Sequence, residues 1–111
     1  MSDYCVIGSG ISGATIANLL NKKFQVNLYD KGRGPGGRAS FKRVKGQIGF
    51  DHGTQYFSPK TIEFKKFTNR LIKIKILKKW SGNHIFLNSK KKENKKHIKI
   101  IGKKGNNDIC K

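Results

Sequence analysis

The chain has 111 residues, which leaves room for one small domain at most. Its formal net charge is +19, and 35% of its residues are hydrophobic, below the roughly 45 to 50% of an average soluble domain. No stretch approaches the about 18 consecutive apolar residues that a membrane-spanning helix needs, so the sequence predicts neither a membrane span nor a membrane partner.

The excess of positive charge raises the hypothesis of a basic polyanion-binding module, with nucleic acid as its partner. Lys, Ile and Asn together make up 43 of the 111 residues, and A/T-rich codons encode all three, so compositional drift is a simpler source of the charge. The lysine-rich run at 90–96 is typical of a solvated loop. We therefore do not expect nucleic acid as the partner and keep the polyanion-binding module as an alternative.

The two cysteines, Cys5 and Cys110, lie near opposite ends of the chain, and neither has a neighbour at metal-ligand spacing. We therefore expect free thiols and no bound metal. The apolar start of the chain lacks the basic leader of a secretory signal and contains three glycines, so a cytoplasmic setting is expected.

The first thirty residues predict a β-α-β unit. The apolar run at 4–7 is typical of a strand in a parallel sheet. From residue 11 to about 22, apolar residues recur at helical spacing, and 25–29 then alternates like a second strand. This order favours an α/β fold, with a partial dinucleotide-binding domain as its form.

Further elements are expected beyond this unit. Runs at 39–44 and 47–50 predict a hairpin through Lys45-Gly46. Ser58-Pro59 predicts a helix start, and the helix should turn four apolar residues inward: Ile62, Phe64, Phe67 and Leu71. Alternation then predicts a strand carrying isoleucines 72, 74 and 76, followed by strands at 84–87 and 97–101 and a helix that begins at 107–108.

The first glycine-rich turn, residues 8–13 (GSGISG), lies between the first strand and the helix. Gly8 allows a tight bend, Gly10 allows the backbone to approach a pyrophosphate, and Gly13 allows the helix to pack closely on the strand. Ser9, Ile11 and Ser12 lie at the helix N-terminus, where backbone N–H groups and the helix dipole favour phosphate. The turn therefore predicts a dinucleotide site.

Asp30 stands at the end of the second predicted strand, 22 positions after Gly8, and Lys31 follows it. A carboxylate at this place accepts hydrogen bonds from the hydroxyls of a bound ribose. A glycine motif alone is weak evidence, but strand, turn, helix, strand and acid occur here in register. These residues by themselves leave the cofactor open between NAD and FAD.

A second glycine-rich turn, residues 32–38 (GRGPGGR), follows Asp30 directly. Alone, it would also suit an arginine-glycine segment for single-stranded nucleic acid. In this position it resembles the flavin-dependent amine-oxidase-like superfamily, in which such a turn follows the ribose-binding acid and lies along the FAD pyrophosphate. The resemblance implies that Gly36, Gly37 and Arg38 contact the diphosphate of FAD.

The resemblance narrows over residues 30–38 (DKGRGPGGR) and 50–57 (FDHGTQYF), which are similar to those of the renalase-like NAD(P)/FAD-dependent oxidoreductases. It implies FAD as the cofactor, and hydride transfer to FAD from a reduced nicotinamide or an amine-type substrate. Members of that family are much longer. We therefore expect an N-terminal FAD-binding portion, with the dinucleotide-binding core at 1–57 and the lysine-rich start of a truncated remainder at 58–111.

Two alternatives stay open about what this chain does alone. It could be a truncated or split product that binds nucleotide without activity, or a subunit completed by another chain that carries the substrate domain. His52 beside Asp51 could act as an acid or base, although such a pair more often fixes a loop, so no catalytic residue is assigned. Phe64, Phe67 and Trp80 are expected to have structural roles.

Overall fold

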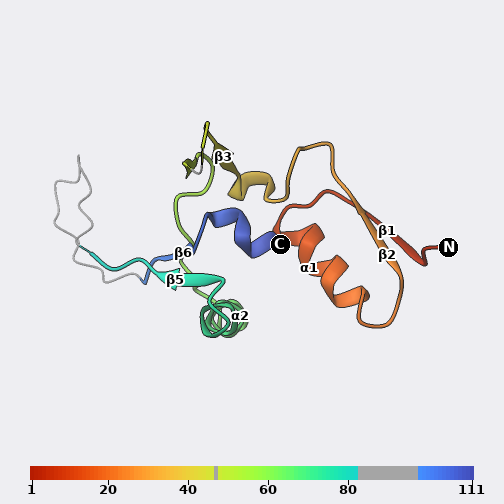
Figure 1. The fold of residues 1–111 in the computed structure, drawn as a ribbon. Coiled ribbons are helices and arrows are strands. Elements are labelled where there is room, and N and C mark those ends of the chain that lie inside the picture. Colours follow the sequence, from red (N-terminus) through yellow and green to blue (C-terminus); the bar gives the residue numbers. More distant parts are fainter. Residues whose placement is uncertain (47, 83–97) are drawn as a thin grey trace.

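The computed structural model describes residues 1–46, 48–82 and 98–111 (Figure 1). In this part of the chain the strands form three separate two-stranded sheets. The strand expected at 84–87 and the loop expected at 90–96 lie outside the described residues.

The N-terminal β-α-β unit is confirmed. Strand β1 (Tyr4–Ile7) pairs in parallel with β2 (Val26–Tyr29), and helix α1 (Ile11–Leu20) connects them (Figure 1). The register places Tyr4 opposite Val26 and Ile7 opposite Tyr29. Short differences at the ends of the helix and of the second strand are the only departures from the predicted bounds of this unit.

The β-α-β unit buries few of its apolar side chains. No residue of α1 is buried, and Ile7 at the end of β1 is 85% exposed. Parallel sheets are normally covered on both faces. In the described part of the chain one helix, α1, packs on the two strands, and Ile7, Leu28 and Tyr29 face solvent.

The predicted hairpin is also confirmed. Strand β3 (Phe41–Arg43) pairs antiparallel with β4 (Gly49–Asp51), after the short 3-10 helix η1 (Gly37–Ala39). The ring of Phe41 explains the glycine in the opposite strand, because a Cβ on Gly49 would lie 2.4 Å from that ring.

The predicted start of the second helix is wrong. Helix α2 (Ile62–Lys73) has Thr61 as its N-cap, and the Thr61 hydroxyl accepts a hydrogen bond of 3.2 Å from the N–H of Phe64. The segment just upstream has long-range partners, and the hydroxyl of Ser58, the expected cap, donates to the carbonyl of Ile98 at 3.3 Å instead of capping a helix. Phe57 exchanges two backbone hydrogen bonds with Ile100, at 2.7 and 2.8 Å, and these hold the chain extended just before Ser58.

The predicted buried face of this helix is confirmed for Phe64, Phe67 and Leu71, and only Ile62, the first residue of α2, departs from it. Ile62 is 67% exposed, contrary to expectation, whereas Leu71 is buried at 8% exposure. Phe64 and Phe67 stack on each other with ring centroids 6.1 Å apart, and both pack against the core. Their structural role is therefore confirmed.

The strand expected to carry isoleucines 72, 74 and 76 is also wrong. The helix continues through Lys73, and Lys75 then takes a left-handed conformation with a φ of 62°. Ile72 and Ile76 pack against the core from the end of the helix, while Ile74 is 60% exposed. Helical burial of Ile72 therefore overrides the local alternation.

The strand that follows, β5 (Leu77–Lys79), pairs antiparallel with β6 (Ile100–Gly102). The described part of the strand expected at 97–101 thus overlaps β6, which begins and ends later. The side chains of Leu77 and Ile100 are each only 2% exposed. Together with three other buried residues they form the core: Ala39, Phe57 and Leu71.

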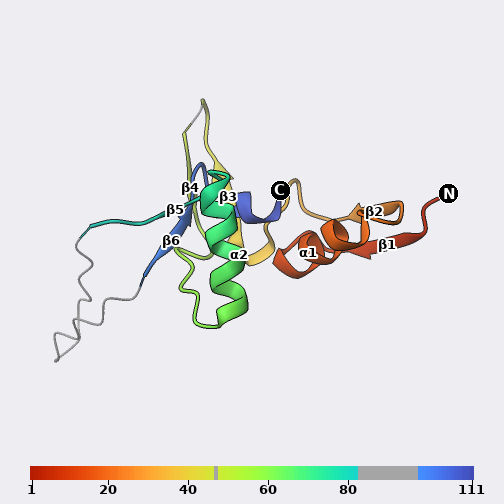
Figure 2. The ribbon, with the colours of Figure 1, turned by 90° about the horizontal axis from the view of Figure 1, so that it is seen from below.

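The helix expected to begin at 107–108 is a 3-10 helix, η2 (Asn106–Cys110). It lies between β6 and α1 and contacts α1, so it links the core to the β-α-β unit (Figures 1 and 2). Within 1–46, 48–82 and 98–111, no helix has the length and apolarity needed to cross a bilayer.

Candidate functional site

The two glycine turns lie side by side at the N-terminus of α1. Gly10 and Gly36 form an isolated parallel bridge, and the N–H of Gly36 donates a hydrogen bond of 3.0 Å to the carbonyl of Ser9. A Cβ on Gly37 would lie 3.2 Å from the Cα of Gly10. The structure therefore brings together two motifs that are separated by 18 residues in the sequence.

Two glycines of the first turn are required by the fold itself. Gly8 has a φ of 98°, a conformation that L side chains rarely adopt. A Cβ on Gly13 would lie 1.7 Å from the carbonyl oxygen of Gly8, so the helix packs directly on the end of the strand. This is the close packing that the motif predicted for Gly13.

Gly10 differs from its two neighbours in the motif. The nearest atom to a Cβ at this position would be the Cα of Gly37, 3.9 Å away, which is ordinary van der Waals contact. The φ of Gly10 is −70°, which other residues also adopt. Nothing in the described part of the fold therefore requires glycine here.

Asp30 connects the two turns. Its Oδ2 accepts hydrogen bonds from the N–H of Ser9 at 2.6 Å and from the Ser9 hydroxyl at 2.7 Å, and its Oδ1 accepts one from the N–H of Gly32 at 2.6 Å. The Ser9 N–H, predicted to face phosphate, is directed at this carboxylate instead. The hydrogen bond from the Ser9 N–H, followed by those from Gly32 and the Ser9 hydroxyl, lowers the pKa of Asp30 to about 2.

The N-terminus of α1 has no side-chain cap. Gly10 is the N-cap, and no acidic residue lies in the first turn. The first N–H groups of a helix have no partners within the helix, and the helix dipole makes this end favourable for anions. Ser12 is exposed at this end, and Ile11 is half-buried against the core.

The residues after the hairpin fix the backbone of the second turn. The carbonyl of Arg38 accepts hydrogen bonds from the N–H of Thr54 at 2.8 Å and from its hydroxyl at 3.1 Å. A Cβ on Gly53 would lie 2.2 Å from the same carbonyl oxygen. The backbone at Arg38 is therefore held firmly, while its side chain is exposed, as is that of Lys31 beside Asp30.

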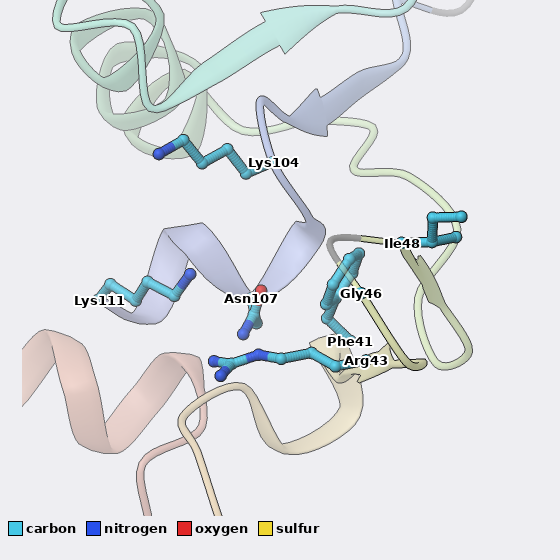
Figure 3. A pocket seen from close by; sticks show the side chains of 7 residues that line it. All are labelled: Phe41, Arg43, Gly46, Ile48, Lys104, Asn107 and Lys111. Carbon is cyan, nitrogen blue, oxygen red and sulfur yellow. The ribbon is translucent and has the colours of Figure 1, made fainter.

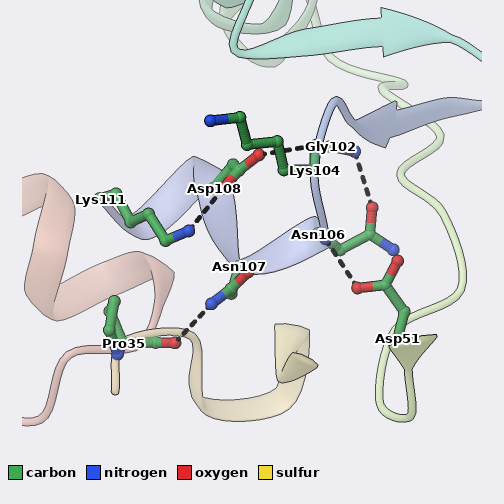
Figure 4. A network of polar contacts seen from close by, with 8 residues as sticks. All are labelled: Pro35, Asp51, Gly102, Lys104, Asn106, Asn107, Asp108 and Lys111. Carbon is green, nitrogen blue, oxygen red and sulfur yellow. Dashed lines mark hydrogen bonds and ion pairs between the residues drawn. The ribbon is translucent and has the colours of Figure 1, made fainter. Parts of the chain in front are cut away.

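Asn106 is a site residue that the sequence did not indicate. It is fully buried, and its amide donates to the carbonyls of Thr54 at 2.6 Å and Gln55 at 2.9 Å. Its side-chain oxygen accepts from the N–H of Gly102 at 2.8 Å (Figure 4). The role of an asparagine in a glycine-rich turn can be recognised only from its partners, and here these lie far away in the sequence.

Asp51 has a structural partner. Its carboxylate accepts a hydrogen bond of 2.7 Å from the N–H of Asn106 (Figure 4). His52 is exposed. The arrangement therefore favours loop fixation over acid–base chemistry for this pair. Among the residues that the structure describes, no three His, Cys, Asp or Glu side chains gather as a metal site would require.

Comparison with known proteins agrees with this geometry. Residues 6–71 match the family described as an NAD(P)-binding Rossmann-like domain, and the match includes both glycine turns, Asp30 and most of α2. Together with the parallel β1-α1-β2 unit, it confirms the predicted Rossmann-like α/β fold. The chain belongs to the family of NAD(P)-binding Rossmann-like domains.

Proposed function

We propose that the two glycine turns bind FAD, and that the chain is the FAD-binding portion of a flavin-dependent oxidoreductase of the renalase-like, amine-oxidase type. The observation that carries the proposal is the contact of Gly10 with Gly36 and Gly37 at the uncapped N-terminus of α1. A dinucleotide pyrophosphate is the anion that such a terminus binds in Rossmann-like domains. The second turn favours FAD over NAD(P) as the resident cofactor, through the resemblance described above.

The residues present fit this cofactor. A free Cβ position at Gly10 leaves space where a pyrophosphate would approach the backbone. Asp30 is ionised and accepts three hydrogen bonds, and a carboxylate has about four acceptor positions, so it can accept a ribose hydroxyl as well. The exposed side chains of Lys31 and Arg38 add positive charge for the diphosphate.

Bound flavin would supply the redox chemistry by accepting a hydride from a reduced nicotinamide or an amine-type substrate. The residues of this chain would bind and orient the cofactor. The backbone N–H groups at the start of α1 would hold the pyrophosphate, and Asp30 would hold the ribose. The two hydrogen bonds from Thr54 to the carbonyl of Arg38 would keep the second turn in place. Alone, the chain would bind nucleotide without turnover.

A fluorescence titration of FAD with the purified chain tests the proposal. We expect saturable quenching of flavin fluorescence by the wild-type chain and its loss in Gly10→Ala, because the added methyl group takes the space of the pyrophosphate. The matched control is Asn18→Ala, at an exposed position of α1 outside both glycine turns. Circular dichroism checks that Gly10→Ala folds like the wild type. A folded wild-type chain that does not bind FAD, or equal binding by all three proteins, would contradict the proposal.

We also propose that further polypeptide covers the β-α-β unit in the working protein. The supporting observation is apolar exposure on both strands, with Ile7 at 85% and Tyr29 at 57%. Such surface would promote self-association of the purified chain. We expect Ile7→Lys to reduce self-association in sedimentation velocity, whereas Ile62→Lys, at a position on α2 that is 67% exposed, should not. Equal effects would indicate nonspecific aggregation.

A further inference from the structure

A second candidate site lies beside the glycine turns. It is a hollow of about 480 Å³ between the β3-β4 hairpin and η2 (Figure 3). Seven residues line it: Phe41, Arg43, Gly46, Ile48, Lys104, Asn107 and Lys111. We propose that this hollow binds a small organic phosphate with an apolar or aromatic body.

The charge around the hollow is positive. Arg43, Lys104 and Lys111 come from β3, from the turn after β6 and from the end of η2. One carboxylate opposes them, because Asp108 pairs with the Lys111 ammonium at 2.7 Å and accepts a hydrogen bond of 2.9 Å from the Lys104 N–H (Figure 4). Two positive charges therefore remain uncompensated among the lining residues, enough to attract a phosphate dianion.

Arg43 is the residue best suited to recognise the phosphate. Its side chain extends beneath Asn107 toward the end of Lys111 (Figure 3). Within the described part of the chain, no carboxylate lies at ion-pair distance from Arg43. A guanidinium presents a planar fork of N–H donors that matches phosphate oxygens, and such charge-assisted hydrogen bonds are the strong ones.

The apolar part of the hollow favours an organic ligand over a bare ion. Phe41 is fixed in place because its ring fills the space of the missing side chains at Gly49 and Gly105, where a Cβ would lie 2.4 and 2.6 Å from it. Ile48 adds apolar surface and is 73% exposed. A volume of about 480 Å³ is within the roughly 300–1,000 Å³ typical of small-molecule sites.

Asn107 separates this hollow from the glycine turns. Its side chain packs against the second turn, since a Cβ on Gly36 would lie 2.9 Å from the Asn107 Cβ, and its amide donates to the carbonyl of Pro35 at 3.5 Å. Because 3.5 Å is a long separation for a hydrogen bond, the amide of Asn107 can turn to a stronger acceptor such as a phosphate oxygen. The hollow and the glycine turns are therefore neighbouring sites with separate charged residues.

Calorimetric and NMR titrations of the full chain with phenyl phosphate test the inference, with inorganic phosphate as the second probe. We expect saturable binding of phenyl phosphate, weaker binding of inorganic phosphate, and amide shifts concentrated at 41–43 and 104–111. Arg43→Gln should weaken phenyl phosphate binding by roughly tenfold or more. The matched control is Lys42→Gln, which removes one charge from the neighbouring position of the same strand, does not line the hollow and should leave binding unchanged.

Lys111→Gln is a second variant, at the exposed end of η2, and should weaken binding less because Asp108 already pairs with this lysine. Equal losses in Arg43→Gln and Lys42→Gln would overturn the inference in favour of diffuse surface charge, as would titrations that never saturate. The FAD site is tested separately. Arg43→Gln should keep FAD binding, and Gly10→Ala should keep phenyl phosphate binding, so either site can fail without the other.

Discussion

The β-α-β unit and the β5-β6-α2 region hold their shapes in different ways. In the first, α1 buries no residue and Ile7 is 85% exposed, so order depends on glycine geometry and on the hydrogen bonds of Asp30. In the second, Leu77 and Ile100 are each 2% exposed, and side-chain packing dominates. The candidate cofactor site thus lies in the part of the molecule that packing stabilises least, where ligand binding contributes most to order.

The largest effect is expected from substitution of Gly13, because the β-α-β unit has no space for a Cβ at this position. Gly13→Ala places a methyl group 1.7 Å from the Gly8 carbonyl oxygen, so α1 must separate from β1. We expect complete loss of FAD quenching and loss of the amide protection of β1 and β2 in hydrogen exchange. Protection of β5 and β6 should persist. Asn18→Ala, at an exposed position of the same helix, is the control. Normal FAD binding by Gly13→Ala would show that the helix does not pack as described.

A pair of alanine substitutions compares the two regions directly. Leu77→Ala should lower the free energy of unfolding by about 2–5 kcal/mol, because it removes a fully buried side chain and leaves a cavity. Ile7→Ala should change it by less than about 0.5 kcal/mol, because the side chain is already in solvent. Urea denaturation followed by Trp80 fluorescence and by far-ultraviolet circular dichroism measures both. Similar losses in the two variants would mean that the β-α-β unit is covered in solution.

The same contrast explains what the sequence could predict. The β-α-β unit and the acid at Asp30 follow from local spacing, because Gly8, Gly10 and Gly13 act within one turn. The late start of α2 follows a segment in which Phe57 pairs with Ile100, 43 residues away, and Ile72 packs against a core to which Ile100 belongs, so no local pattern encodes either feature. Asn106 was missed for the same reason, since its partners Asp51, Thr54 and Gln55 lie 51 to 55 residues upstream.

A smaller effect tests the revised boundary of α2. Thr61→Ala removes the hydroxyl that accepts the N–H of Phe64 and should lower the free energy of unfolding by about 1 kcal/mol. Ser58→Ala, at the position first predicted as the cap, removes only an exposed hydrogen bond of 3.3 Å to the carbonyl of Ile98 and should cost less than about 0.5 kcal/mol. Urea denaturation of both variants measures these two losses of stability. A larger loss in Ser58→Ala would restore the earlier helix start.

The most local effect is expected from protonation of Asp30, which acts only on the β-α-β unit. Its pKa is lowered from 3.8 to about 2 by the hydrogen bonds from the Ser9 and Gly32 N–H groups. A depressed pKa means that the ionised carboxylate favours the folded state. This contribution is complete above pH 3.8 and is lost as the pH falls through about 2.

NMR titration of the Asp30 carboxyl carbon should therefore give a midpoint near 2. Exchange of the Ser9 and Gly32 amides should accelerate at the same pH, while the amides of β5 and β6 do not follow that midpoint. In Asp30→Asn the pH dependence at Ser9 and Gly32 should disappear. A midpoint near 3.8 would show that the carboxylate is not held between the two glycine turns, and the order of the β-α-β unit would then need another source.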